Sequence, residues 1–145
     1  MHFEWLKILK KQKKHLLLHR ISKLHTMQYD TLLISNVKEL YIFPFEKILF
    51  ISADGNYSYI HCVNDETITV VAQLGDIHEQ IYNRARNYKH LVRIGRSLII
   101  NMSYLVGIDL QKGYLALMND YKIINIKASV ESLKKLKAEL EQIYG

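Results

Sequence analysis

The sequence predicts a mostly β domain, with about ten short, mainly antiparallel strands in small packed sheets, one internal helix and one C-terminal helix. Three observations predict this fold class. From residue 31 onward, short apolar runs of strand length alternate with turn residues. Helical spacing of apolar residues is clear in only two stretches of that region. Strands and helices do not alternate over lengths that would build a parallel sheet, so antiparallel pairing is expected.

The first half of this region is predicted to consist of strands joined by tight turns. The expected strands cover residues 32–34, 40–43, 48–53, 57–63 and 67–72. Pro44 cannot donate a hydrogen bond to a ladder, so it is expected to end the second strand. Asp54 and Gly55 favour a turn, which predicts that the third and fourth strands form a hairpin.

The second half begins with a helix near residues 73–85, because Leu74, Ile77 and Ile81 recur at helical spacing. Further strands are expected at residues 91–94, 98–100, 105–110, 114–118 and 123–126. The chain then ends in a helix that starts after Ser129, a residue type that favours the N-cap. The apolar stripe of this helix consists of Val130, Leu133, Leu136, Leu140 and Ile143.

The net charge of +6 is concentrated at the N-terminus. Residues 1–25 hold seven of the twenty Lys and Arg residues and one acidic residue, whereas the rest of the chain holds thirteen of each sign. Leu17, Ile21 and Leu24 recur at helical spacing. We therefore predict a basic, helical N-terminal arm over residues 1–28 and a folded domain over residues 29–145.

The role of this arm stays open at the level of sequence. A basic helix can lie on a membrane surface, contact DNA or bind a second subunit or partner protein. It can equally be a solvated extension whose few leucines pack on the domain. No apolar run in the chain is long enough to span a bilayer, and no signal peptide is visible. The single cysteine, Cys62, cannot form an intrachain disulfide, so a reducing cytoplasm is expected.

Motifs of the common enzyme classes are absent from the sequence. Neither a dinucleotide-binding glycine motif, a P-loop nor a zinc-protease motif occurs, and the carboxylates are dispersed. The sequence therefore predicts a protein that is not an enzyme and that needs no cofactor or metal. A different feature points to a binding function, namely a stretch without acidic residues between Glu79 and Asp109. It is predicted to form a positive surface that attracts phosphate and contains Arg84, Arg86, Lys89, His90, Arg93 and Arg96.

Three stretches of sequence resemble the LytTR family of DNA-binding domains. Residues 48–57 look like the family's strand and acidic Gly-Asn-Tyr turn, and residues 91–101 are similar to its most specific signature, which contains Arg and Arg-Ser. Residues 123–127 look like the strand that leads into its last helix. Gly95 stands where the family usually has His, Leu91 where it has Phe, and Lys127 where it has Arg. Gly95 removes a polar side chain, so the target DNA sequence cannot be taken over from relatives.

This resemblance implies a compact β domain that inserts inter-strand loops into successive major grooves of double-stranded DNA at promoters. It implies a sequence-specific transcriptional regulator, with a homodimer on paired half-sites as an open question. Many relatives carry a receiver domain, for which the roughly 28 residues before the first strand are too few. An input signal is then expected from a sensor or partner protein, from protein abundance or through residues 1–28. The alternative function is a protein-interaction or membrane-surface adaptor that acts through the same arm.

The resemblance also implies roles for residues near the Arg-Ser signature. Arg96 is the expected base contact, since its guanidinium matches guanine O6 and N7. Arg93 is expected to be either a phosphate contact or a buried ion-pair anchor that shapes the loop. Ser97 is expected to donate to phosphate, whereas Asn101 is expected to fix a turn through backbone hydrogen bonds.

Two further turns carry expected contacts. Tyr57, with Asn56 beside it, occupies the turn where relatives place a DNA-contacting side chain, although tyrosine is also common in strands for packing reasons. Lys127 lies before the last helix, where a point charge favours phosphate over a base. The regulator hypothesis therefore requires that three separate turns lie together on one side of the fold.

Overall fold

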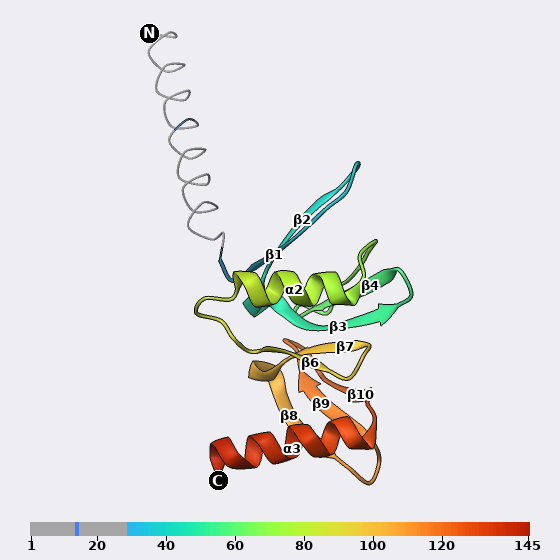
Figure 1. Cartoon of the computed structure of the whole chain (residues 1–145), viewed down its shortest axis with the longest axis vertical. Helices are drawn as coiled ribbons and strands as arrows, with labels where there is room; N and C mark the ends of the chain where they lie inside the picture. Colours follow the sequence, from blue (N-terminus) through green and yellow to red (C-terminus); the bar gives the residue numbers. More distant parts are fainter. Residues whose placement is uncertain (1–13, 15–28) are drawn as a thin grey trace.

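We analysed a computed structural model that describes residue 14 and residues 29–145. The helical arm predicted for residues 1–28 thus lies outside the described residues, apart from Lys14. The domain contains ten strands and two α-helices in these residues (Figure 1). In chain order the elements are β1 (Thr31–Ser35), β2 (Leu40–Pro44), β3 (Ile48–Asp54), β4 (Tyr57–Cys62), β5 (Thr67–Val70), α2 (Leu74–Arg84), β6 (Leu91–Ile94), β7 (Leu98–Asn101), β8 (Leu105–Asp109), β9 (Tyr114–Met118), β10 (Ile123–Lys127) and α3 (Val130–Tyr144).

The strands form three antiparallel sheets, as the sequence predicted. The central sheet has five strands in the order β5-β4-β3-β7-β6, a second sheet has the order β10-β9-β8, and β1 pairs with β2 alone. Two single-turn 3₁₀ helices, η1 (Phe45–Lys47) and η2 (Met102–Tyr104), were not predicted. Three residues are too few to show any periodicity in a sequence.

Several predicted strand ends were wrong by one or two residues, and the ends of β2 and β5 show why. β2 includes Pro44, which lies opposite Thr31 at the open end of the hairpin. β2 is an edge strand, so a missing N–H on its outer side removes no ladder bond. β5 ends at Val70 rather than at residue 72. The carbonyl of Ala72 accepts a hydrogen bond from the Ser58 hydroxyl at 2.7 Å, so that a side chain replaces the ladder there.

The central sheet is buried on both faces, which explains the continuous apolar runs of β3 and β7. One face packs against α2 and the β1–β2 hairpin, and the other packs against the three-stranded sheet and α3 (Figure 1). In β7, Ile99 belongs to the α2 side, whereas Leu98 and Ile100 belong to the α3 side. This alternation is the two-residue period of a strand with both faces in a core.

The C-terminal helix begins as predicted, but its apolar stripe is only partly buried. The Ser129 side chain accepts a hydrogen bond from the Ser132 N–H at 3.1 Å, which makes Ser129 the N-cap. Leu133 and Leu136 are buried, whereas Ile143 is 73% exposed at the end of the helix. Among the helices of the described residues, none combines the length and apolar content needed to cross a bilayer.

Candidate nucleic-acid interface

The β3–β4 and β6–β7 turns lie side by side at one end of the central sheet. β3 pairs with β7 in a register that places Ser52 opposite Leu98. Just beyond this pair, the N–H of Ala53 donates to the carbonyl of Ser97 at 2.9 Å. Two of the three sequence motifs, separated by about forty residues, are therefore joined by main-chain contacts.

The start of α3 lies against the β6–β7 turn. A Cβ atom added at Gly95 would lie 3.4 Å from the Ser132 hydroxyl, which is in the first turn of α3. A hollow of about 530 Å³ separates the two segments, with Arg93 and Gly95 on one side and Ser132 and Lys135 on the other. The third motif, residues 123–127, ends two residues before α3 begins, so it leads directly into the helix that meets the β6–β7 turn.

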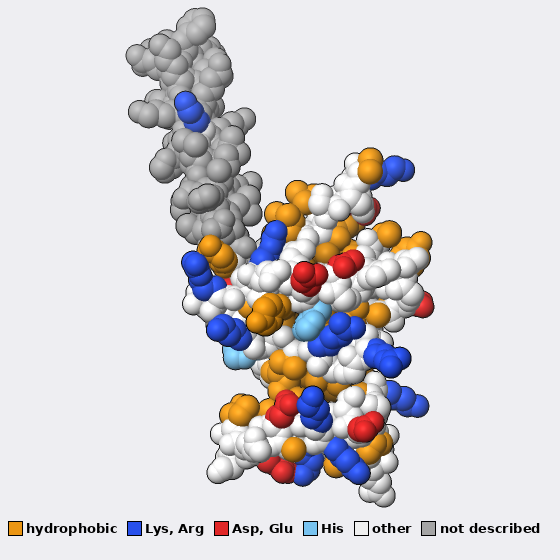
Figure 2. Space-filling view, in the orientation of Figure 1, with side chains coloured by type: hydrophobic (Ala, Val, Ile, Leu, Met, Phe, Trp, Pro, Cys, Tyr) orange, Lys and Arg blue, Asp and Glu red, His pale blue; other side chains and the backbone are white. Residues whose placement is uncertain are grey.

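Lys127 lies at the end of β10, next to the β8–β9 turn. It ends β10 opposite Tyr114, and its side chain is exposed. The next residue, Ala128, donates its N–H to the carbonyl of Gly113 at 3.3 Å, which brings the β8–β9 turn alongside. Figure 2 shows Lys and Arg side chains, with Asp and Glu side chains among them, along the right and lower flank of the molecule.

The β6–β7 turn holds Arg96 and Ser97 out into solvent. Gly95 has φ +62°, a left-handed conformation that costs a side chain steric strain, and this permits a tight reversal of the chain. The Arg93 guanidinium donates to the carbonyl of Arg96 at 3.0 Å. Within residues 29–145 no carboxylate pairs with Arg93, and its side chain is half-exposed. The expectation of a buried ion-pair anchor was therefore wrong, because Arg93 braces the turn through a carbonyl oxygen.

The β3–β4 turn presents one free and one restrained side chain. Tyr57 is 50% exposed at the start of β4. The Asn56 side chain is tied to α2, because its Oδ1 accepts from the Gln73 amide at 3.2 Å. The Tyr59 hydroxyl donates to Asp54 at 3.2 Å, and this hydrogen bond, with the charge of Asp54, raises the pKa of Tyr59. The orientation of this turn is thus set by α2 and by β4.

Asn101 fixes the chain behind the β6–β7 hairpin, as predicted. Its side chain is fully buried, and its amide donates to the carbonyls of Phe45 and Ile48 at 3.2 and 2.8 Å. Its Oδ1 accepts from the Ser103 N–H at 3.1 Å and from the Tyr88 hydroxyl at 3.0 Å. One side chain thereby joins the end of β7 to the start of β3 and to the loop after α2.

The family model of the LytTr DNA-binding domain matches residues 38–141. The chain belongs to the LytTR DNA-binding domain family. A solved structure also matches, the LytTr DNA-binding domain of a methyl-accepting/DNA response regulator from Bacillus cereus, at 17% identity and a TM-score of 0.53. The match covers 77% of this chain and 96% of that chain, and it shows a shared fold. A search of curated proteins gave no significant match.

In this LytTR domain the predicted positive stretch from Arg84 to Arg96 is divided between two ends of the sheet. Leu91 pairs with Asn101, so the residues before Leu91 lie at the far end of β6 from the β6–β7 turn. The Arg86 guanidinium stacks on the Tyr29 ring at 3.8 Å, away from that turn. The prediction of a single positive surface was therefore wrong, because the charges before Leu91 and Arg96 lie beyond opposite ends of β6, with Arg93 inside the strand.

Three residues of the LytTR domain near the turns were not among the predicted contacts. Ser132 and Lys135 share one side of α3, since they are three residues apart on a helix. Lys112 lies in the β8–β9 turn, where its N–H donates to the Asp109 carboxylate at 2.9 Å. The helical spacing of Ser132 and Lys135 is visible in the sequence, but the element that faces them is not.

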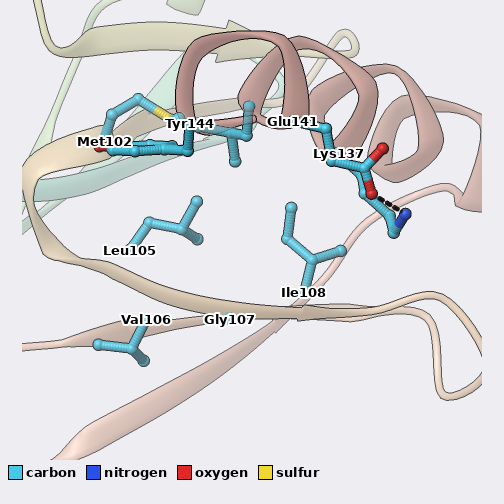
Figure 3. A pocket seen from close by; sticks show the side chains of 9 residues that line it. Met102, Leu105, Val106, Gly107, Ile108, Lys137, Glu141 and Tyr144 are labelled. Atoms are coloured by element: carbon cyan, nitrogen blue, oxygen red, sulfur yellow. Dashed lines mark hydrogen bonds and ion pairs between the residues drawn. The ribbon is translucent and has the colours of Figure 1, made fainter.

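A second hollow of the LytTR domain lies away from the turns, between β8 and the last two turns of α3 (Figure 3). Figure 3 shows Leu105 and Ile108 reaching from β8 toward the helix. Two of its described lining residues are charged, Lys137 and Glu141, and they pair with each other. This hollow is therefore mainly apolar, in contrast to the region around the turns.

Proposed function

We propose that this protein is a sequence-specific transcriptional regulator that inserts its inter-strand turns into the major groove of double-stranded DNA. It acts in the cytoplasm by binding rather than by catalysis, and as a homodimer on paired half-sites. The observation that supports this most directly is the meeting of the first two motifs at one end of the domain, beside the start of α3. The hydrogen bond from Ala53 to Ser97 joins these two motifs, and the approach of Ser132 to Gly95 places α3 beside them.

The chemistry of the turns suits duplex DNA. Arg96 is exposed on the turn between β6 and β7, and its guanidinium can donate two hydrogen bonds to guanine. Arg93 restricts the backbone that carries Arg96, which lowers the entropy lost when the side chain binds. Lys127 and Lys112 lie near each other at the end of β10 and in the β8–β9 turn, where the Ala128 N–H bonds the Gly113 carbonyl, and both suit contacts to phosphate.

Replacing Arg96 with alanine is expected to lower affinity for a cognate duplex by about tenfold or more, and to lower affinity for random duplex far less. A bidentate arginine–guanine pair contributes roughly 1–3 kcal/mol of discrimination. The cognate duplex is first selected from a random pool, and both affinities are measured by fluorescence anisotropy at fixed salt. Lys89→Ala is the control, because it removes the same charge at the opposite end of β6. Equal weakening of both duplexes by Arg96→Ala would assign Arg96 to phosphate and contradict base reading.

Replacing Lys127 with alanine is expected to weaken cognate and random duplexes alike. Loss of one phosphate contact should reduce the slope of log affinity against log salt by about 0.9. The matched control is Lys122→Ala, since Lys122 lies beyond the opposite end of β10 and pairs with Asp65 at 3.4 Å. A Lys127 variant with an unchanged salt slope would remove this residue from the interface.

The alternative function is an adaptor that acts through the N-terminal arm, which is suggested by the concentration of positive charge in residues 1–25. The arm lies outside the described residues, so a deletion experiment has to separate the two functions. Removing residues 1–28 should leave most of the cognate affinity in place under the regulator proposal. The adaptor instead requires negligible duplex affinity in the full chain, and loss of vesicle or partner binding on deletion.

A further inference from the structure

The β1–β2 hairpin projects from the domain as a two-stranded sheet (Figure 1). Its tip residue Val37 is fully exposed, and Leu40 and Ile42 of β2 are 60% and 43% exposed. Within residues 29–145 no strand pairs with the outer edge of β2. β1 also lies outside the stretch that the family model matches, so the complete hairpin is not part of the shared match.

The alternation of hydrogen-bonded and non-hydrogen-bonded pairs in the hairpin shows which backbone groups face outward. The N–H of Asn36 donates to the carbonyl of Glu39 at 2.9 Å, and the N–H of Phe45 donates to the carbonyl of Asp30 at 2.9 Å. Both are hydrogen-bonded pairs of one antiparallel register, and such pairs alternate with pairs that share no hydrogen bond. Leu40 of β2 lies in a pair of the second kind, so its N–H and carbonyl point away from β1.

Leu33 and Ile42 form another pair without mutual hydrogen bonds, so the N–H and carbonyl of both residues also point away from the hairpin. The outward groups of Leu33 in β1 are both satisfied by Gln80 of α2. The Leu33 N–H donates to Gln80 Oε1 at 2.6 Å, and the Gln80 amide donates back to the Leu33 carbonyl at 2.9 Å. The edge of β1 is thus closed by a side chain, whereas the edge of β2 at Ile42 has no partner among residues 29–145 and is a template for another strand.

We propose that β2 pairs antiparallel with β2 of a second copy of this chain. Leu40 lies opposite Ile42 of the other copy, and Tyr41 lies on the twofold axis. This register joins the two copies through four backbone hydrogen bonds, because both outward residues exchange N–H and carbonyl groups. Pro44 has no N–H, so a register that uses Pro44 forms fewer bonds.

The charges at the two ends of β2 favour a second copy as the occupant. Lys38 and Glu39 precede the strand, Glu46 and Lys47 follow it, and all four side chains are exposed. Antiparallel pairing places the first pair near the second pair of the other copy. Positive and negative side chains then lie at both ends of the paired strands. Between them, the exposed Leu40 of one copy lies opposite the exposed Ile42 of the other.

This inference rests on the proposed function only for the use of the dimer on paired half-sites. The pairing itself is tested on the full chain without DNA, by sedimentation equilibrium. Ile42→Pro is the decisive variant, because it removes an outward N–H and no bond between β1 and β2. It is expected to raise the dimer dissociation constant at least about tenfold, since two intermolecular hydrogen bonds are lost.

Val37→Lys is the control, because it changes a more exposed apolar residue of the same hairpin outside the proposed pairing and should leave the dimer intact. Circular dichroism and thermal unfolding establish that Ile42→Pro still folds. A wild-type chain that is monomeric at high micromolar concentration would overturn the pairing, as would an Ile42→Pro dimer of unchanged strength. Binding of Ile42→Pro to a single half-site should match the wild type, so this test fails or succeeds independently of the DNA proposal.

The register is tested by cross-linking in a Cys62→Ser background. Tyr41→Cys places two thiols across the twofold axis in a pair without hydrogen bonds, where Cα atoms are about 4.5 Å apart and a disulfide can form. It should cross-link under mild oxidation much faster than Val37→Cys at the hairpin tip. Equal rates for the two variants would reject this register.

Discussion

Replacing Asn101 with leucine is expected to lower the free energy of unfolding by about 3–5 kcal/mol. The leucine would leave the carbonyls of Phe45 and Ile48 without the donors that they have in the fold. It would also leave the Ser103 N–H without its acceptor, whereas the Tyr88 hydroxyl keeps the Ser103 hydroxyl as an acceptor at 3.1 Å. A buried polar group that loses its partner keeps its desolvation cost, so the three losses reinforce one another.

Urea unfolding of the Asn101 variant provides the measurement, with the slope against denaturant checked for constancy. Ser103→Ala is the matched control, because it removes one exposed hydroxyl from the same cluster and should cost below about 1 kcal/mol. If Asn101→Leu cost no more than Ser103→Ala, the buried amide would not be what holds β7 to β3.

Replacing Asp30 with alanine is expected to destabilise the domain by about 2–4 kcal/mol. The Asp30 carboxylate accepts hydrogen bonds from the backbone N–H groups of Arg86, Asn87 and Tyr88, at 2.8 to 3.2 Å. Loss of bonds to a charged acceptor accounts for most of the effect. Asp30 also has φ 57°, a left-handed conformation that aspartate tolerates better than alanine.

The same carboxylate gives the stability a defined dependence on pH. Partial burial by itself would raise the pKa of Asp30, but the three backbone donors and the charge of Arg86 outweigh it and hold the pKa below its ordinary value of 3.8. A carboxyl whose pKa is lowered on folding binds its proton more readily in the unfolded chain. Its contribution is therefore complete above the unfolded pKa, near 3.8, and is lost as the pH falls through the folded pKa.

Asp30→Asn separates the charge from the geometry. Asparagine tolerates the left-handed conformation and keeps one oxygen acceptor, but it does not titrate in this range. The difference in unfolding free energy between wild type and Asp30→Asn should be constant above about pH 5 and should shrink below pH 4. A difference that stayed constant down to pH 3 would show that the charge of Asp30 does not stabilise the fold.

Most of the fold could be predicted from sequence because its signals are local. Strand alternation and turn residues gave all ten strands to within one or two residues at each end, and Ser129 marked the start of α3. The errors also have local causes. Pro44 ends a strand only where an N–H is needed, and β2 has an outer edge that needs none within the described residues.

The candidate site could be predicted only in part. Four expected contact residues are exposed, namely Arg96 and Ser97 on a turn and Tyr57 and Lys127 at strand ends beside turns. Asn101 is the buried residue that fixes the chain behind the β6–β7 hairpin. The side-chain contacts that hold those turns in place could not be predicted from the sequence. Arg93 bonds the Arg96 carbonyl rather than a carboxylate, and Gln73 restrains Asn56 from the start of α2.

The sequence by itself determined where the chain extends, turns and coils, and which family motifs it carries. Only the tertiary structure decided which turns lie together and which charges lie apart. The contacts concerned join residues far apart in sequence, such as Ala53 with Ser97, Gln80 with Leu33 and Asp30 with the loop after α2. Residue patterns report the faces of a single element, whereas the meeting of two elements depends on packing across the whole core.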